Sequence, residues 1–309
     1  MDLPASVPDI VTVAEARELG IGRRRLQGAR AERHLHGLYS PERRARDEAE
    51  LHLSLLRATT AAGADVASHG SAALVWGFPG ARVPEELHLL SVAGDRRSRV
   101  RGTTGRRGLV LPSEVVRVGG IAVTTPGRTW LDLARAAGER RLVLWADWLF
   151  NPVWGGQWDR LPLSTPERLR DLLAAHRGKP GIRRARLALD RARVGSDSPQ
   201  ETSLRLALVD AGLPEPAVNQ WIVHPLTGER LHRGDLTYQD LRIDLEYDGE
   251  HHSGPLQVQR DIERAERLQS VDWMELRFSA RHARDDWAPA VRKTRAALLA
   301  RGWTPGSPA

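Results

Sequence analysis

The stretch Ile243–His252, IDLEYDGEHH, alternates three acidic residues with three apolar ones and ends in a glycine, a glutamate and two histidines. Side chains two residues apart along a β-strand lie on the same face of the strand. A strand here would turn its apolar residues to a core and its three acids, Asp244, Glu246 and Asp248, to the other side. Like charges on one face repel each other, and a bound metal ion would explain why they gather.

A second strand is predicted just upstream in RGDLTYQDLRID, with Tyr238-Gln239-Asp240 as the turn between the two strands. A hairpin with that turn brings Asp235 near Glu246. Converging carboxylates bind a hard divalent cation, which keeps part of its water shell and bridges to phosphate. The pattern therefore predicts a Mg²⁺ site, with Mn²⁺ as the alternative ion, held by Asp235, Glu246 and Asp248.

The acidic pattern also has a purely structural interpretation. The glycine after Asp248 is consistent with a turn that has a solvated acidic rim. We interpret Asp240 and Asp244 in this way, as turn and edge-strand charges.

Two further residues are candidates for the chemistry of this site. His252 could position or deprotonate a water molecule, whereas the adjacent His251 would face the opposite way in an extended chain. Glu201 stands in Ser198-Pro199-Gln200-Glu201, the pattern of a capping box at the start of a helix. The same glutamate could reach a metal if that helix packs across the strand pair, and both interpretations stay open.

The overall composition limits the class of protein. A chain of 309 residues is long enough for two or three domains, and 41% hydrophobic with 28% charged residues is typical of a folded globular protein. The formal net charge of +7 favours polyanionic partners. Arginine dominates the cations, which suits phosphate binding but also follows from a GC-rich coding sequence. The absence of cysteine excludes disulfides, thiolate-bound zinc and thiol catalysis.

The expected compartment is the cytoplasm. The N-terminus has no basic segment followed by an apolar core, and no apolar run approaches the roughly 18 residues of a spanning helix. We therefore expect no membrane partner.

Residues 10–40 have the order of a winged helix-turn-helix. A short helix, a turn at Gly20-Ile21-Gly22, a second helix in RRRLQGARAER and a strand-turn in HLHGLYSP follow one another. The second helix carries the cations Arg23, Arg24, Arg25 and Arg30. They could contact DNA, or they could form a solvated basic helix end.

The middle of the chain predicts an α/β region. Strands are expected in ELHLLSV (86–92) and IAVTT (121–125), and SHGSAALVWGFPG predicts a capped helix that ends at Gly77. VGSDSP then marks a boundary, because Gly, Ser and Pro cluster between periodic segments.

The C-terminal part resembles the PD-(D/E)XK nuclease superfamily, in the branch similar to the very-short-patch mismatch repair endonuclease. It is specifically similar to an uncharacterised actinobacterial group of such domains. The matching segments, in order, are SPQETSLRLALVDAGLPEP, RGDL, LEYDGEHH and RDIERAERLQSVDWMELRF. The resemblance implies a restriction-endonuclease-like α/β/α core with a central mixed sheet over residues 196–303, and metal-dependent cleavage of DNA.

The same resemblance assigns roles to single residues. Asp235 and Glu246 would be the two signature acids, and Glu201 the glutamate of the preceding helix. Asp248 stands where the superfamily usually has a lysine, a departure also known in the repair-endonuclease branch, where a nearby histidine takes part in catalysis. That histidine would be His252 here.

The helix that includes RDIERAERL is placed beside the site by this resemblance. Its Arg264 would contact a phosphate or serve packing.

The N-terminal part resembles the AbiEi-type antitoxins of type IV toxin–antitoxin systems. GIGRRRLQGARAERHLHGLYS matches the winged segment, and SHGSAALVWGFP, ELHLLSV and AVTTPGRTWLDLARAAG match the α/β domain after it. The resemblance implies DNA binding, autoregulation and a cognate toxin as partner. The expected organisation is a winged helix (8–45), an α/β domain (46–150), a helical linker (151–195) and the nuclease-like domain (196–303).

The sequence thus predicts a Mg²⁺-dependent DNA endonuclease that hydrolyses phosphodiesters with a metal-activated water. Its catalytic residues would be Glu201, Asp235, Glu246, Asp248 and His252. The alternative is an antitoxin-like transcriptional regulator whose nuclease-fold domain does not cut, since a fold alone does not fix an activity.

Overall fold

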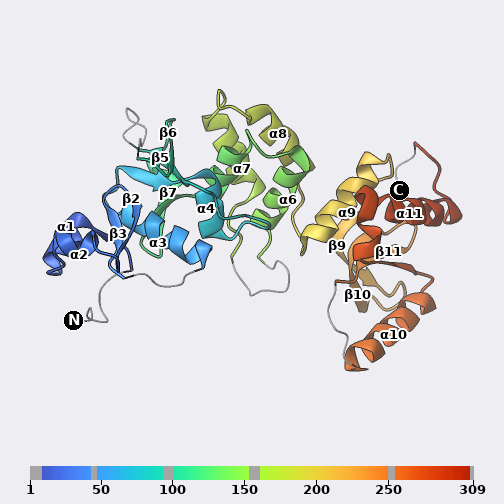
Figure 1. The fold of residues 1–309 in the computed structure, drawn as a ribbon. Coiled ribbons are helices and arrows are strands. Elements are labelled where there is room, and N and C mark those ends of the chain that lie inside the picture. The colour runs from blue at the N-terminus through green and yellow to red at the C-terminus, as the bar shows by residue number, and fades with distance from the viewer. Residues whose placement is uncertain (1–8, 43–46, 93–99, 153–160, 250–254, 307–309) are drawn as a thin grey trace. The chain divides into compact units, whose positions relative to one another are not determined.

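The computed structural model describes residues 9–42, 47–92, 100–152, 161–249 and 255–306 (Figure 1). It is a mixed α/β protein with three sheets, of three, five and four strands. The chain divides into two compact units: unit 1 comprises residues 1–137 and 167–185, and unit 2 comprises residues 138–166 and 186–309. Within the part of the chain that the structure describes, no helix is long and apolar enough to cross a membrane.

Unit 1 begins with two short helices and a hairpin, in the order predicted from the sequence. The elements are β1 (Val11–Thr12), α1 (Val13–Glu18), α2 (Arg23–Leu26), β2 (Glu32–Leu35) and β3 (Leu38–Ser40), and β1 pairs with β3. The second helix was predicted to run through RRRLQGARAER, but α2 ends at Leu26. Gly28, two residues later, is a poor helix former, and its N–H closes a turn onto the carbonyl of Arg25. Arg30 therefore lies outside the helix.

The rest of unit 1 is built on a five-stranded sheet with the strand order β6-β5-β4-β8-β7. The strands are β4 (Asp65–Ala67), β5 (Leu87–Ser91), β6 (Thr103–Arg106), β7 (Val115–Val118) and β8 (Ile121–Thr124). The helices are α3 (Glu48–Thr60), α4 (His69–Trp76), α5 (Pro126–Leu133) and α7 (Pro166–Ala175). The two predicted strands are confirmed as β5 and β8, and Gly77 ends α4 in the left-handed conformation at φ 70°.

The segment expected to be a linker is divided between the two units. His176, just after α7, lies with its Nε2 2.5 Å from Glu114 Oε1 in unit 1. α6 (Glu139–Phe150), predicted as part of the α/β domain (46–150), belongs instead to unit 2. It packs on α9 (Pro199–Asp210), where its buried Asp147 accepts hydrogen bonds from Thr202 Oγ1 and Arg205 Nη2, both at 2.9 Å. α8 (Ile182–Arg191) runs across the boundary between the two units.

Unit 2 has a four-stranded mixed sheet with the order β12-β11-β10-β9. Its strands are β9 (Ala217–Val223), β10 (Arg230–Tyr238), β11 (Ile243–Tyr247) and β12 (Met274–Phe278). The first three are antiparallel, and β12 runs parallel to β11. The parallel pair needs a crossover, which α10 (Pro255–Ser270) provides. After β12, the chain forms α11 (Ala288–Ala300).

The helices of unit 2 cover both faces of this sheet. α9 and α11 lie on one side and α10 on the other (Figure 1). Ile243 and Leu245 are fully buried in the core under α9 and α11, and Tyr247 packs against it, as the alternation predicted. The predicted turn is confirmed between β10 and β11, where the N–H of Leu241 donates to the carbonyl of Tyr238. The short 3₁₀ helices are η1 (Pro112–Glu114) in unit 1, and η2 (Ala280–His282) and η3 (Arg284–Trp287) in unit 2.

Candidate metal centre

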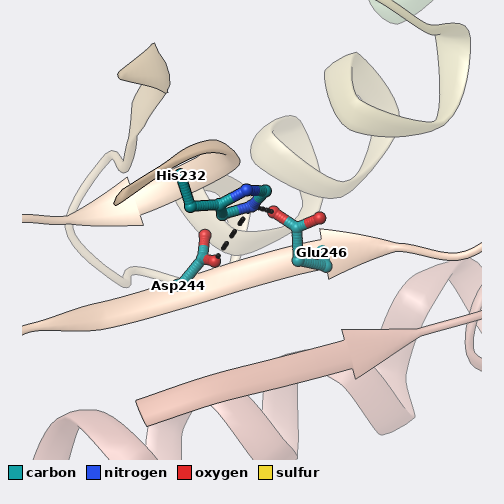
Figure 2. A group of neighbouring side chains, drawn as sticks. All are labelled: His232, Asp244 and Glu246. Carbon is teal, nitrogen blue, oxygen red and sulfur yellow. Dashed lines mark hydrogen bonds and ion pairs between the residues drawn. The ribbon is translucent and has the colours of Figure 1, made fainter. Parts of the chain in front are cut away.

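Three side chains with metal-binding atoms converge on the face of the unit 2 sheet opposite its apolar core. They are His232 on β10 and Asp244 and Glu246 on β11, each with one ligand atom within 4.8 Å of the others (Figure 2). His232 Nε2 lies 2.9 Å from Glu246 Oε1 and 3.6 Å from Asp244 Oδ2. A histidine nitrogen and two carboxylates therefore point to one small volume between neighbouring strands.

Asp244 is the most unusual member of this group. It is fully buried, and neither of its carboxylate oxygens has a hydrogen-bond partner among the described residues. The sequence interpretation of Asp244 as an edge-strand charge is wrong, because β11 lies between β10 and β12 in the sheet. A buried carboxylate without partners is costly unless a proton or a cation neutralises it.

The space for the Asp244 carboxylate depends on a glycine in the neighbouring strand. A Cβ atom on Gly234 of β10 would lie 2.1 Å from Asp244 Oδ1. Real carbon and oxygen atoms do not approach so closely, so any side chain at position 234 would displace the carboxylate. The glycine of the RGDL segment thus keeps this space open, which is one reason for a glycine inside a strand.

Asp235 lies beside the group, as the predicted hairpin required. Its N–H donates to Glu246 Oε1 at 3.1 Å, and its Oδ2 accepts from the N–H of Tyr247 at 2.9 Å. Burial, the negative charge of Glu246 and then that of Glu201 raise the pKa of Asp235 to about 8. The predicted proximity of Asp235 to Glu246 is therefore confirmed.

Glu201, in the first turn of α9, takes part in the hydrogen bonds that cap this helix and lies close to the same carboxylates. Its N–H donates to Ser198 Oγ at 3.2 Å, while its Oε2 accepts from the N–H of Asp197 at 2.9 Å and from Asn219 Nδ2 at 3.1 Å. The reciprocal bond of the predicted capping box thus goes to Asp197, one residue before the cap. Burial raises the pKa of Glu201 to about 7.

The electrostatics of the group oppose the simultaneous ionisation of its neighbouring carboxylates. Burial, followed by the charges of Glu246, Glu275 and Asp235, raises the pKa of Asp244 to about 9. Burial alone would also raise the pKa of Glu246, but the hydrogen bond and positive charge of His232 hold it below its usual value. A divalent cation would relieve the repulsion that raises the pKa of Asp244.

The arginines near the group contact its carboxylates. Arg264 Nη1 lies 3.6 Å from Glu246 Oε2, and Arg264 Nε lies 3.3 Å from Glu275 Oε2. Arg277 pairs with the other oxygen of Glu275. Arg264, for which a phosphate contact and a packing role were both open, thus forms ion pairs with protein carboxylates.

Asp248 and His252 are not brought into this group by the described structure. The Asp248 side chain is 50% exposed, its Oδ2 lies 3.8 Å from Arg277 Nη1, and its N–H donates to the carbonyl of Phe278. Alternation alone would put Asp248 with Glu246, but the strand ends at Tyr247 and the regular alternation ends with it. His252 lies outside the described residues.

The arginines proposed for DNA binding lie in unit 1, on and after α2. Arg23, Arg24 and Arg30 are exposed, and Arg25 Nη2 is 3.7 Å from Glu42 Oε1. Their exposure agrees with either sequence interpretation, a phosphate contact or a solvated helix end.

The sequence pattern does not reveal two residues of the converging group: it predicts no role for His232 and a structural role for Asp244. The signal for both is the segment LHRGDL, where a histidine and a glycine precede Asp235 inside a predicted strand. An isolated glycine in a strand suggests that another group approaches the backbone closely.

The residues present fit a divalent metal ion. Asp244 offers two buried oxygens that have no hydrogen-bond partner within the described part of the chain, and Gly234 leaves the space that they occupy. Carboxylates suit Mg²⁺ and Mn²⁺, whereas imidazole is a ligand more typical of transition metals. His232, Asp244 and Glu246 would hold the ion, and the imidazole favours Mn²⁺ over Mg²⁺.

Comparison with known proteins places the chain in a family. It is 31% identical over 216 residues to the uncharacterized proteins MT2308 and Rv2248 of two strains of Mycobacterium tuberculosis, an alignment that covers 68% of this chain and 73% of each relative. The chain therefore belongs to the family of these mycobacterial proteins. No protein-family model matches the chain, and no solved structure matches it.

Proposed function

We propose that unit 2 is a metal-dependent DNA endonuclease of the PD-(D/E)XK type, with a restriction-endonuclease-like core. The observation that carries this proposal is the buried Asp244 carboxylate, whose oxygens have no partner among the described residues and lie beside Glu246 and His232. A buried carboxylate without partners is stabilised when a cation binds to it, which supports a metal site here.

The order of elements supports the same proposal. A helix, three antiparallel strands, a crossover helix and a parallel strand follow one another, and the acids lie on the two central strands. This order agrees with the nuclease family that the segments RGDL and LEYDGEHH resemble. Asp235 and Glu246, the two signature acids of that resemblance, are joined by a hydrogen bond.

The chain's own residues would divide the chemistry among them. A bound divalent ion would lower the pKa of water and stabilise charge on phosphate oxygens. His232, Asp244 and Glu246 would hold it, and the contact of 2.9 Å between His232 Nε2 and Glu246 Oε1 keeps these two side chains together. Arg264 would keep Glu246 and Glu275 oriented through its ion pairs.

DNA is the proposed substrate because cations predominate on this chain. The net charge is +7, and Arg23, Arg24 and Arg30 are exposed near the N-terminus. We propose that this segment is a winged helix that binds phosphates, so that DNA affinity falls as salt rises.

The test is cleavage of supercoiled plasmid by the full chain with Mn²⁺, with Mg²⁺ and with EDTA. We expect nicking with Mn²⁺, less with Mg²⁺ and none with EDTA. Glu246→Gln and Asp244→Asn should each reduce the rate at least about a hundredfold, since even partners one shell further out cost about 10–100-fold.

A matched control variant lies in the same hairpin. Asp240 is an exposed acid in the turn between β10 and β11, so Asp240→Asn should cleave like wild type. Cleavage that survives in Glu246→Gln at the wild-type rate would refute the proposed site. Asp248→Asn tests which of two ligand sets is used. The set predicted from the sequence includes Asp248, so this variant should then lose cleavage. The set in the structure does not include Asp248, so the variant should then still cleave.

A second candidate function is favoured by Asp248 itself. It stands where nucleases of this type usually carry a lysine, and its side chain is half exposed beside Arg277. An antitoxin-like regulator that binds DNA, or a cognate toxin, without cutting would explain the missing lysine. Such a protein should bind duplex DNA equally with and without metal, and Glu246→Gln should leave that binding unchanged.

A further inference from the structure

Unit 1 contains a cavity of about 370 Å³ that the proposed endonuclease does not use. It lies among residues from the start of α4, strand β6, the end of α5 and the turn before α8, all within unit 1. The lining residues that matter for its chemistry are His69, Arg106, Arg107, Asp132, Arg135 and Lys179. We refer to it as the Arg106 cavity.

The charges of the Arg106 cavity favour an anion. Four of its lining side chains are cations and one is a carboxylate. Arg107 and Arg135 are exposed, whereas Arg106 is partly buried and its Nε has no hydrogen-bond partner among the described residues. Guanidinium groups bind phosphate oxygens well, so three arginines and a lysine around one cavity favour a phosphate ligand.

The one carboxylate is held in place by the fold. Asp132 is 3% exposed, and its Oδ1 accepts from Arg128 Nε at 2.9 Å and lies 2.8 Å from Lys179 Nζ. Burial opposes the charge of Asp132, but Arg128, His69 and Lys179 together hold its pKa below the usual value. The second oxygen, Oδ2, is buried without a hydrogen-bond partner among the described residues. As an ionised oxygen, Oδ2 can accept a hydrogen bond from a hydroxyl or amino group of a ligand.

The approach of Lys179 to Asp132 depends on a glycine two residues later. Gly181 has φ +92°, and a Cβ atom there would lie 2.6 Å from backbone atoms of Ala134 and Arg135 at the end of α5. The segment before α8 can therefore pack directly on the end of α5. This packing closes one side of the Arg106 cavity.

A neutral histidine completes the lining. His69 is the first residue of α4, and its Nδ1 lies 3.0 Å from Ser68 Oγ. It has φ 49°, a left-handed conformation that is uncommon for a residue with a side chain. Burial, with neighbouring cations, lowers the pKa of His69 to about 4, so it carries no charge at neutral pH.

We propose that the Arg106 cavity binds a small phosphate monoester that also carries hydroxyl groups, of about the size of a mononucleotide. The arginines would take the phosphate, and Asp132 Oδ2 would accept from a sugar hydroxyl, as acidic residues do for ribose in other nucleotide sites. The volume lies in the range of small-ligand pockets, roughly 300–1,000 Å³. A duplex backbone fits less well, because a cavity of about 370 Å³ has room for a single small ligand.

The test is isothermal titration of the full chain with five probes at one ionic strength: adenosine 5′-monophosphate, ribose 5-phosphate, inorganic phosphate, adenosine and a duplex oligonucleotide. We expect the two phosphorylated sugars to bind at least about tenfold more tightly than inorganic phosphate or adenosine. A charge-assisted hydrogen bond contributes about this much or more to affinity.

Variants locate the binding. Arg106→Gln and Arg135→Gln should each weaken ribose 5-phosphate binding about tenfold or more, and Arg135 is exposed enough for its removal to leave the fold intact. Arg101→Gln is the matched control, an exposed arginine of the same segment outside the lining, and should bind like wild type. The proposal is overturned if no phosphorylated probe binds saturably, if both lining variants bind like wild type, or if only the duplex binds.

Discussion

Replacing Asp244 by asparagine should make the metal-free protein more stable while removing its response to metal. In wild type, burial and neighbouring acids raise the pKa of Asp244 to about 9, against an ordinary value of 3.8. A raised carboxyl pKa contributes stability that is fully present below pH 3.8 and is lost as the pH rises toward 9. At pH 7.5 the loss is about 5 kcal/mol, at 1.36 kcal/mol per pKa unit.

The asparagine side chain does not ionise, so the variant avoids this loss of stability, but the substitution also has a destabilising effect. Its amide would be buried where the carboxylate has no partners, which costs about 1–3 kcal/mol. The net expected gain is therefore about 2 kcal/mol or more in EDTA at pH 7.5. For a folding unit of this size, that gain raises the Tm by roughly 4–8 °C.

The assay is thermal unfolding of wild type, Asp244→Asn and the turn control Asp240→Asn, each in EDTA and in excess Mn²⁺. Wild type and the control should gain about 2.7 kcal/mol when the ion is at a hundred times its Kd, and Asp244→Asn should gain almost none. If Asp244→Asn unfolds at a lower temperature than wild type in EDTA, the carboxylate stabilises the fold and the reasoning fails. An undiminished Mn²⁺ response in Asp244→Asn would refute its role as a ligand.

Three further changes test other parts of the chain. Gly234→Ala should abolish the Mn²⁺-dependent rise in Tm, because its Cβ would displace the buried carboxylate opposite; a wild-type response would contradict this. Burial lowers the pKa values of His52 and His69 to about 4. Above pH 6.5 these histidines therefore do not reduce the free energy of unfolding of unit 1. As the pH falls from 6.5 toward 4, each should reduce it by up to about 3 kcal/mol, because the unfolded chain takes up a proton that the folded chain does not. Urea unfolding at pH 7 and pH 4.5 measures this loss, and His52→Gln should reduce it. Gly181→Ala should destabilise the protein by about 1–3 kcal/mol in the same urea assay, whereas Gly178→Ala, with open space around it, should be close to neutral.

The parts of the fold that could be predicted depend on local pattern. The alternation in IDLEYDGEHH correctly gives the buried residues of β11, and the turn after Tyr238 fixes which residues of the hairpin face each other. Ser198 is confirmed as a helix cap because capping is decided by residues adjacent in sequence. These features need no knowledge of distant contacts.

The ligand set of the candidate metal centre could not be read in the same way. His232 and Asp235 are three residues apart, so a regular strand would place them on opposite faces. In the structure, the His232 side chain and the Asp235 N–H nevertheless both contact Glu246 Oε1, an arrangement that alternation along β10 does not predict. The burial of Asp244 also depends on β12, which joins the sheet only after α10 and covers the side of β11 that the hairpin leaves open.

Three aspartates, Asp132, Asp147 and Asp244, are almost completely buried in the described structure, and they differ in how their charge is met. Asp132 is paired with Arg128 and Lys179, and Asp147 with Arg205. Asp244 Oδ2 lies 3.6 Å from His232 Nε2, which also contacts Glu246 Oε1 at 2.9 Å. The fold surrounds Asp244 with further acids instead, and together with burial they raise its pKa to about 9. A proton or a cation must therefore neutralise this carboxylate, and the response of Asp244→Asn to Mn²⁺ distinguishes the two.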